Sequence, residues 1–226
     1  NLWDYYFDAQ RCQIDLYSYR EQIEFAINKS LEMYQKAQEA NNVRGLIGAK
    51  QCLANAYMGT GRWEEGKKAL EEAHMLLPKL DNVIVHNSVL CQLVSLSKAK
   101  DDFENLKKYL DEQKSILEDY IRKNPTMEEA FQDPLIFNEL YYAYYYLEMN
   151  QPHPAFEHLQ KGAKYLTPHT YFMYRVLYYD AYALYYRRCK EYDKALSQLD
   201  STIVLLQEAF SSDYVNQLSA KADILV

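Results

Sequence analysis

Glycine and proline are scarce in this sequence, with six of each among 226 residues. Tight turns must therefore be few, which disfavours an all-β sandwich or barrel. Cysteine is also sparse: Cys12, Cys52, Cys91 and Cys189 lie about 40 to 100 residues apart and form no CxxC pair. This spacing fits neither a metal site nor a small disulfide framework, so we interpret the four cysteines as small, buried, free thiols.

Positive charge is in deficit: the chain has 25 Lys and Arg residues and 32 Asp and Glu residues, which gives a net charge of -7. Nucleic-acid binding depends on Lys and Arg neutralising phosphates, so no nucleic-acid partner is expected. No run of 18 apolar residues exists, and no membrane insertion by this segment is expected. The sequence opens at Asn1 with neither an initiating Met nor a signal peptide, so we expect a fragment of a larger chain.

Motifs that carry chemistry are missing as well. The sequence contains no GxxxxGK[ST], GxGxxG, HExxH or GxSxG. His153 and His158 are five residues apart, which does not align two imidazoles on one helix face, and the other three histidines are isolated. Acidic residues alternate with Lys in stretches such as "WEEGKKALEE", as on solvated helix surfaces. We predict no metal, no cofactor and no enzymatic activity.

Apolar residues recur at helical spacing almost throughout, and short polar breaks divide the chain into about ten helices. A repeat is clearest in "LANAYMGTGRWEEGKKALEEAHMLLP" (53–78), which has small residues at Ala54, Gly66 and Ala73 and an aromatic Trp63 after the turn. Small residues let two helices approach closely. This stretch resembles the tetratricopeptide repeat (TPR). The resemblance implies an all-α solenoid of antiparallel helix pairs, wound as a right-handed superhelix.

The aromatic or proline after each turn marks the repeats. Taking Tyr19, Trp63, Phe103, Pro152 and Tyr192 as these markers gives gaps of 44, 40, 49 and 40 residues. We predict one domain over 1–226, with repeats at roughly 3–44, 45–80, 81–124, 134–168 and 169–211 and a partial repeat at 213–226 whose N-cap is Asp213. The stretch 122–137 contains two prolines, and we expect a loop that either spaces repeats three and four or covers the groove.

Tyrosine is abundant, with 23 residues against eight phenylalanines. An offset of 40 places Tyr142 on Tyr182 and Tyr146 on Tyr186, so both stretches are the first helix of a repeat. We predict that these four rings pack on the second helix, that Tyr145 and Tyr185 pack between neighbouring repeats, and that Tyr144 points into the groove. Many hydroxyls must then reach partners at the edges of the helix pairs.

TPR arrays bind ligands in a concave groove lined by first helices. Carried over by alignment, the resemblance implies that a protein or peptide contacts the residues at these inward positions: Gln51, Asn55, Ser88, Ser95, Lys98, Leu140, Tyr144, Asp180, Leu184, Arg187 and Arg188. Chaperone-binding TPR domains hold a terminal carboxylate with cations, but here Gln51 accompanies Asn55 in place of Lys, and the next repeat offers Cys91 and Ser95. That mode of binding is therefore disfavoured.

The long repeats, "ANNVRGLIGAKQCLANAYMGTGRWEEG" above all, resemble those of bacterial signalling proteins of the Bacteroidetes type, in which a TPR array precedes a histidine kinase or a DNA-binding domain. The resemblance implies a sensory or regulatory input module, periplasmic if it serves a membrane kinase and cytoplasmic otherwise. A stand-alone scaffold or co-chaperone-like adaptor is the alternative, and a homodimer is considered for either role. Residues following Val226 would separate the two.

Overall fold

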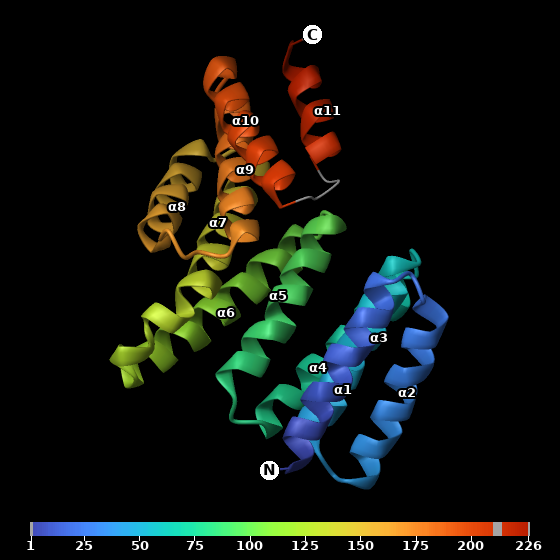
Figure 1. Cartoon of the computed structure of the whole chain (residues 1–226). Coiled ribbons are helices and arrows are strands. Elements are labelled where there is room, and N and C mark those ends of the chain that lie inside the picture. The colour runs from blue at the N-terminus through green and yellow to red at the C-terminus, as the bar shows by residue number, and fades with distance from the viewer. Residues whose placement is uncertain (1, 210–213, 226) are drawn as a thin grey trace. The chain divides into compact units, whose positions relative to one another are not determined.

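The computed structural model describes residues 2–209 and 214–225, and within them it contains eleven α-helices, three short 3-10 segments and no strand (Figure 1). The predicted all-α class is confirmed, whereas the predicted N-cap Asp213 lies outside the described residues. The α-helices are α1 (Leu2–Tyr19), α2 (Ile23–Glu39), α3 (Val43–Gly59), α4 (Trp63–Leu76), α5 (Val83–Ala99), α6 (Phe103–Lys123), α7 (Gln132–Glu148), α8 (Pro152–Tyr165), α9 (Phe172–Arg188), α10 (Tyr192–Glu208) and α11 (Tyr214–Leu225).

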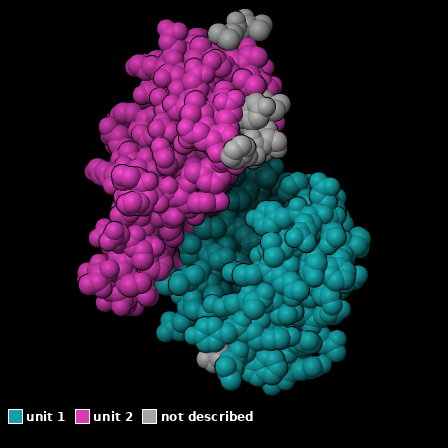
Figure 2. Space-filling model, viewed as in Figure 1, with its two compact units in different colours: residues 1–109 teal, residues 110–226 magenta. Residues whose placement is uncertain are grey.

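By its contacts the chain divides into two compact units, residues 1–109 and 110–226, and the boundary falls inside α6 (Figure 2). In unit 1, α2 packs on α1 and α3, and α3 also packs on α1 and α4. In unit 2, α7 packs on α8 and α9, and α10 packs on α9 and α11. The helices α2, α3, α7 and α10 thus each contact both their own partner and a helix of the neighbouring pair, as a stack of helix pairs requires.

The turn inside each helix pair has the same construction. The second of the three residues between its two helices lies in the left-handed region of the backbone, with φ between 53° and 75°. These residues are Glu21, Gly61, Asp101, Asn150 and Lys190, and they are separated by 40, 40, 49 and 40 positions. Only Gly61 adopts this conformation without a steric penalty, while Asn and Asp tolerate it better than most residues. The repeat is therefore built into the backbone as well as the sequence.

Two sequence predictions about boundaries need correction. The second helix of the first pair begins at Ile23, whereas the predicted marker Tyr19 is the last residue of α1. The predicted loop 122–137 is largely helical: only residues 124–131 separate α6 from α7, and 3-10 turns at Pro125–Met127 and Glu129–Phe131 occupy most of them. Pro134 lies in the first turn of α7, where a proline removes no intrahelical hydrogen bond.

Close approach of helices in unit 1 depends on Gly45 of α3. A Cβ atom at this position would lie 2.6 Å from Cδ2 of Phe7 in α1 and 2.9 Å from Cβ of Ala37 in α2. The same glycine donates its N–H to Oδ1 of the N-cap residue Asn42, at 2.7 Å. Gly45 therefore lets three helices meet at the start of α3.

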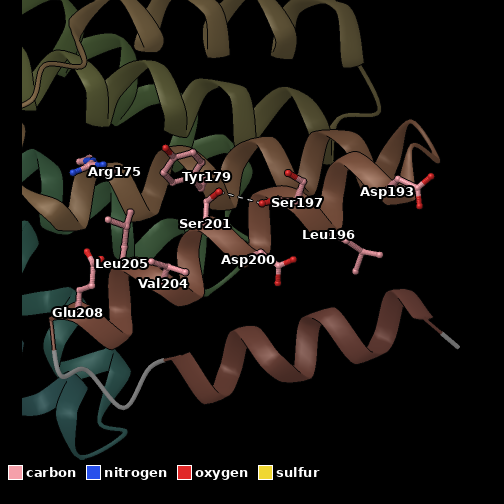
Figure 3. A pocket seen from close by; sticks show the side chains of 10 residues that line it. All are labelled: Arg175, Tyr179, Asp193, Leu196, Ser197, Asp200, Ser201, Val204, Leu205 and Glu208. Carbon is pink, nitrogen blue, oxygen red and sulfur yellow. Dashed lines mark hydrogen bonds between the residues drawn. The ribbon is translucent and has the colours of Figure 1, made fainter.

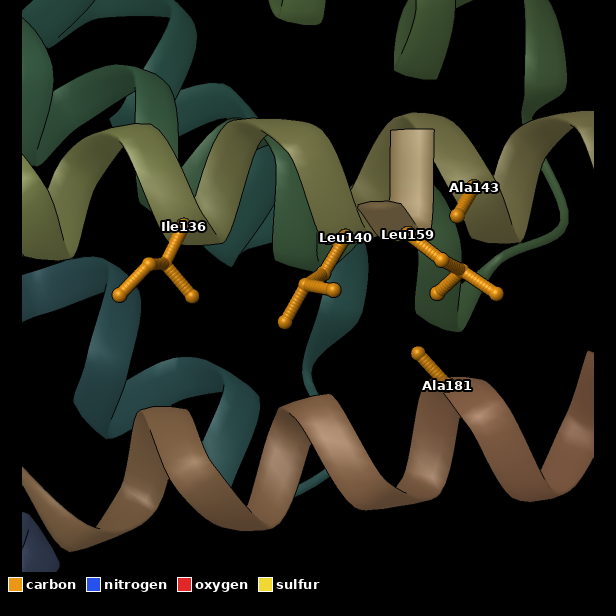
Figure 4. Packing of buried hydrophobic residues seen from close by; sticks show 5 residues of the cluster. All are labelled: Ile136, Leu140, Ala143, Leu159 and Ala181. Atoms are coloured by element: carbon orange, nitrogen blue, oxygen red, sulfur yellow. The ribbon is translucent and has the colours of Figure 1, made fainter. Parts of the chain in front are cut away.

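The core of unit 2 is built on α7. Ile136, Leu140 and Ala143 form a buried row along it and pack against Leu159 of α8 and Ala181 of α9 (Figure 4). Tyrosines close this core from the side, and they include Tyr178, Tyr182 and Tyr185 of α9.

The predicted roles of the tyrosines can be compared with this packing. Tyr142 is 4% exposed, stacks on His158 of α8 at 4.8 Å between ring centroids, and donates its hydroxyl to Asp111 at 2.5 Å. Tyr185 stacks on Phe156 of the preceding pair at 5.2 Å. Both predictions are confirmed, and the phenol of Tyr142 finds a carboxylate, as a buried hydroxyl requires.

Candidate functional site

Polar side chains connect the first helices of successive pairs, and the connected residues are about one repeat apart in sequence. Within unit 1 these contacts join α1 to α3 and α3 to α5, and within unit 2 they join α7 to α9 and α9 to α11. The contacts are Asn42 to Asp4 (2.7 Å), Arg44 to Asp8 (2.6 and 3.0 Å), Gln51 to Ser88 (2.9 Å) and Gln92 (2.7 Å), Gln92 to Asn55 (2.7 Å), Arg188 to Glu148 (2.9 Å, twice) and Gln217 to Asp180 (3.2 Å).

In unit 1 several of these contacts join into one network across three helices. Asn55 of α3 hydrogen-bonds the carboxylate of Asp15 in α1, and its Oδ1 accepts the Nε2 donor of Gln92 in α5. Gln92 in turn accepts a hydrogen bond from Gln51, which also donates to Ser88. The amide dipoles are thereby fixed in orientation across this face.

Burial sets the acid–base behaviour at one end of this network. It raises the pKa of the Asp15 carboxyl, while the nearby Arg11 guanidinium and the hydrogen bond from Asn55 act in the opposite direction. Burial likewise raises the pKa of the Cys52 thiol to about 12, and the negative charge of Asp15 adds to the effect. Cys52 is therefore an inert thiol at neutral pH. The prediction that all four cysteines are buried holds for Cys52 alone, since Cys12 is exposed and Cys91 and Cys189 are half-buried.

A hollow of about 400 Å³ lies beside the network, between α3 and α5. Met58, Trp63, Leu96 and Ala99 form its apolar wall, and Asn55, Cys91, Gln92 and Ser95 add polar groups. The ammonium group of Lys100 lies 4.7 Å from the centre of the ring of Trp63, the first residue of α4, and makes a cation–π contact with it. An apolar hollow with a few oriented polar groups is the usual form of a ligand site.

A second, smaller hollow of about 220 Å³ lies in unit 2, among α9, α10 and α11. Three predicted groove residues, Asp180, Leu184 and Arg187, line it together with Gln217, and so the structure brings them to one place. Arg188 also belongs to the predicted set. It is exposed on α9, and its guanidinium binds both carboxylate oxygens of Glu148.

Other predicted residues are placed differently. Gln51 is only 4% exposed and Leu140 only 1%, so the prediction that these two side chains contact a ligand is wrong. Gln51 uses both amide protons inside the network, and Leu140 fills the core next to Gly162. Ser95 is exposed at the hollow of unit 1, whereas Lys98 and Ser88 are half-buried on α5 and Tyr144 is half-buried on α7.

Sequence reasoning missed Gln92 and Trp63 as parts of this site. Gln92 lies one turn after Ser88, a position already assigned to the groove, so its spacing could have revealed it. Trp63 was assigned to repeat packing as the marker after the turn, and nothing in the sequence shows that its ring also borders a hollow. It becomes a site residue only through the position of α5.

A buried ionisable pair in unit 2 was also missed. Nδ1 of His158 lies 2.6 Å from Oε2 of Glu139, and both side chains are about one-tenth exposed. The imidazole is stacked on Tyr142 and on Tyr146, at 4.8 and 5.3 Å between ring centres. Lys114 of α6 lies 4.0 Å from the other carboxylate oxygen. All these partners come from packed helices, so the pair holds α7 and α8 together.

A larger hollow of about 670 Å³ lies on α10, and α9 contributes Arg175 and Tyr179 to it (Figure 3). Its lining mixes carboxylates with apolar side chains, and Val204 there is about half exposed. The hydroxyl of Ser201 is turned back to the carbonyl of Ser197, at 3.1 Å. This hollow runs along α10, which is the second helix of its pair, and no sequence prediction pointed to it.

No group of three or more His, Cys, Asp or Glu side chains in residues 2–209 and 214–225 could hold a metal ion. Over the same ranges, every helix is too short or too polar to cross a membrane.

Comparisons with known proteins identify the fold. BtubC (BKLC) from P. vanneervenii superposes with a TM-score of 0.67 at 12% identity, over 89% of this chain and 82% of that one. Two crystal structures of kinesin light chain TPR-like repeats from Podosopora anserina superpose with TM-scores of 0.63 and 0.61 at 17% and 16% identity, over 91% of this chain and 97% of theirs. No protein-family model and no curated protein matches the sequence. The chain has the predicted TPR-like fold of stacked antiparallel helix pairs.

Proposed function

We propose that this chain is a non-catalytic module that binds a protein or peptide along the face formed by its first helices. The observation that carries the proposal is the amide network of Asn55, Gln92 and Gln51 beside the apolar hollow of unit 1. Asn55 is exposed and Gln92 is half-buried, and each carries N–H and C=O groups that match those of an extended peptide, while the buried Gln51 holds them in orientation. The hollow then receives one apolar side chain of that peptide.

The composition of the hollow limits the kind of peptide. Its lining contains no Lys or Arg, and the whole chain carries a net charge of -7. An anionic chain terminus would find no Lys or Arg in the lining with which to form charge-assisted hydrogen bonds, and the ammonium of Lys100 at its edge lies against the Trp63 ring. We therefore propose an internal, neutral or basic segment with one large apolar residue. The face of unit 2, with Tyr144, Asp180, Arg187 and Arg188, is proposed as a second contact region.

A display experiment tests this proposal. The protein is used to select binders from a phage library of random peptides about 12 residues long, and the affinity of a selected peptide is measured by fluorescence anisotropy. Asn55→Ala should weaken binding roughly 5- to 30-fold, because it removes about 1–2 kcal/mol of hydrogen bonding. Ser95→Trp should weaken it further by filling the hollow.

The matched control is Asn28→Trp, which places the same side chain at an exposed position on the second helix α2. It should leave affinity within twofold of the wild type. Circular dichroism confirms that each variant folds. Equal affinity of the wild type and Ser95→Trp would contradict the proposed site.

The output of such a module is a second part of the proposal. We propose that it is the regulatory input domain of a bacterial signalling protein, and the support is the resemblance of its long repeats to those of kinase-linked TPR arrays. Binding along the first helices would then shift the equilibrium between two states of the array. A histidine kinase or DNA-binding domain in the same open reading frame would support this role. A reading frame that ends after one capping helix would favour the stand-alone scaffold.

A further inference from the structure

The first helix carries an apolar stripe that faces solvent. Leu2, Tyr5, Ala9, Cys12, Leu16 and Tyr19 recur at intervals of three and four residues along α1, and all six side chains are exposed. The exposed fractions of the large ones are 88% for Leu2, 75% for Tyr5, 57% for Leu16 and 86% for Tyr19. The opposite face carries the buried Phe7 and Ile14, which pack into unit 1. This spacing is typical of the seam along which two helices pack.

The same face is covered in the other first helices. An offset of 40 maps Ala9, Cys12 and Leu16 onto Ala49, Cys52 and Ala56 of α3, which are at most 1% exposed. In α9 the equivalent residues are Tyr178, Ala181 and Tyr185, and they pack on the core formed by α7 and α8. This face of a first helix is therefore a contact face wherever a neighbouring pair is present.

We infer that a second copy of this chain covers the stripe, with the two α1 helices antiparallel about a two-fold axis. The stripe reads the same in both directions: its spacings are 3, 4, 3, 4 and 3, and two large residues at each end flank two small ones. In an antiparallel pair Leu2 meets the second copy's Tyr19, Tyr5 meets its Leu16, and Ala9 meets its Cys12. Self-complementarity of this kind is what an isologous interface requires.

The size and charge of the stripe agree with this occupant. The large side chains of the stripe, Leu2, Tyr5, Leu16 and Tyr19, expose roughly 700 Å². Each partner in a standard protein interface buries about 800 Å². None of the six residues is charged, and the neighbouring Asp8 is already bound to Arg44 of its own copy. No unpaired acid at that position would therefore oppose the association.

The inference does not depend on the proposed groove, and its test is the oligomeric state. Sedimentation equilibrium of the 26.7 kDa chain should show a reversible dimer of twice that mass. The protein concentration should run from about 1 to 200 µM, because interfaces of this size commonly associate in that range. Leu16→Glu should raise the dissociation constant at least tenfold, because it buries an unpaired carboxylate in the seam. The matched control is Ile84→Glu, an exposed position (65%) on α5 that should not change the constant.

Orientation is tested with an introduced thiol. In the Ala9→Cys variant an antiparallel dimer places the new thiol opposite Cys12 of the other copy, so mild oxidation should give a covalent dimer on a non-reducing gel. Trypsin cuts between the two positions at Arg11, and the linkage should join the peptide ending at Arg11 to the peptide beginning at Cys12. A monomer across the whole concentration range, or a dimer that Leu16→Glu leaves intact, would overturn the inference. A linkage mainly between like positions would overturn the orientation.

Discussion

Replacing Gly45 by alanine tests whether the close helix contact at the start of α3 is required. The new Cβ would lie 2.6 and 2.7 Å from two ring atoms of Phe7 and 2.9 Å from Cβ of Ala37, and neither neighbour is the flexible end of a side chain. Overpacking of this kind costs about 1–3 kcal/mol, and alanine regains at most about 1 kcal/mol through helix propensity. We expect a net loss of about 1.5 kcal/mol in the free energy of unfolding.

Urea unfolding followed by circular dichroism measures this loss. With a slope of about 1–3 kcal/mol per molar urea, the midpoint should fall by roughly 0.5–1.5 M. The matched control is Gly48→Ala in the same helix, where the nearest atom is the terminal methyl of Met33 at 3.2 Å and can move aside. We expect this variant to be as stable as the wild type or slightly more stable. If Gly45→Ala is as stable as Gly48→Ala, the reasoning about the contact is refuted.

Three further results are expected. At pH 8 and about 1 µM protein, iodoacetamide should alkylate the exposed Cys12 and leave Cys52 unmodified until urea is added, because a pKa of about 12 leaves Cys52 with roughly a thousandth of the ordinary thiolate. His158→Ala should cost about 2–3 kcal/mol in urea unfolding, because it removes the buried contact of Nδ1 with Glu139 and the stacking on Tyr142 and leaves that carboxylate only Lys114, 4.0 Å from its other oxygen. His153→Ala, at an exposed site, should cost less than about 0.5 kcal/mol. Burial, and then a hydrogen bond with the Cys189 thiol, raises the pKa of Tyr185 from 10.0 to about 12. Because this folded-state pKa lies above the unfolded value, the contribution of Tyr185 to stability is present below pH 10 and is lost as the pH rises from 10 to 12. Tyrosinate absorbance and the urea midpoint, followed over this pH range, should report the loss together.

The fold was predictable because the repeat leaves a local signal. Small residues at helix crossings and an aromatic after the turn identify the second helix pair without reference to any partner. The first pair was placed four residues out of register, since its marker position holds the aliphatic Ile23 and its left-handed turn residue is Glu21. Neither residue type is distinctive for that position. The prolines of 122–137 suggested a loop for a similar reason: the sequence does not show that Pro134 lies within a helix's first turn.

The candidate site was only partly predictable, because side-chain pairing between repeats decides which polar groups remain accessible. Helical spacing placed Gln51 and Asn55 on the same face of α3. It could not show that Gln51 is buried by its contacts with Ser88 and Gln92, while Asn55 remains exposed at the edge of the hollow. Similarly, Leu140 and Tyr144 are one turn apart on α7, yet the first is core and the second is half-buried. These differences depend on contacts about 40 residues away in sequence.

The central claim is that a peptide enters the hollow of unit 1, and Trp63 on its wall provides the most direct measurement. The chain has two tryptophans, so Trp3→Phe leaves Trp63 as the sole indole reporter. Titration of this variant with a selected peptide should give a saturable change in tryptophan emission, with the same dissociation constant as anisotropy on the labelled peptide. If the peptide binds by anisotropy while Trp63 emission stays constant and Ser95→Trp binds normally, the peptide lies elsewhere and the account is contradicted.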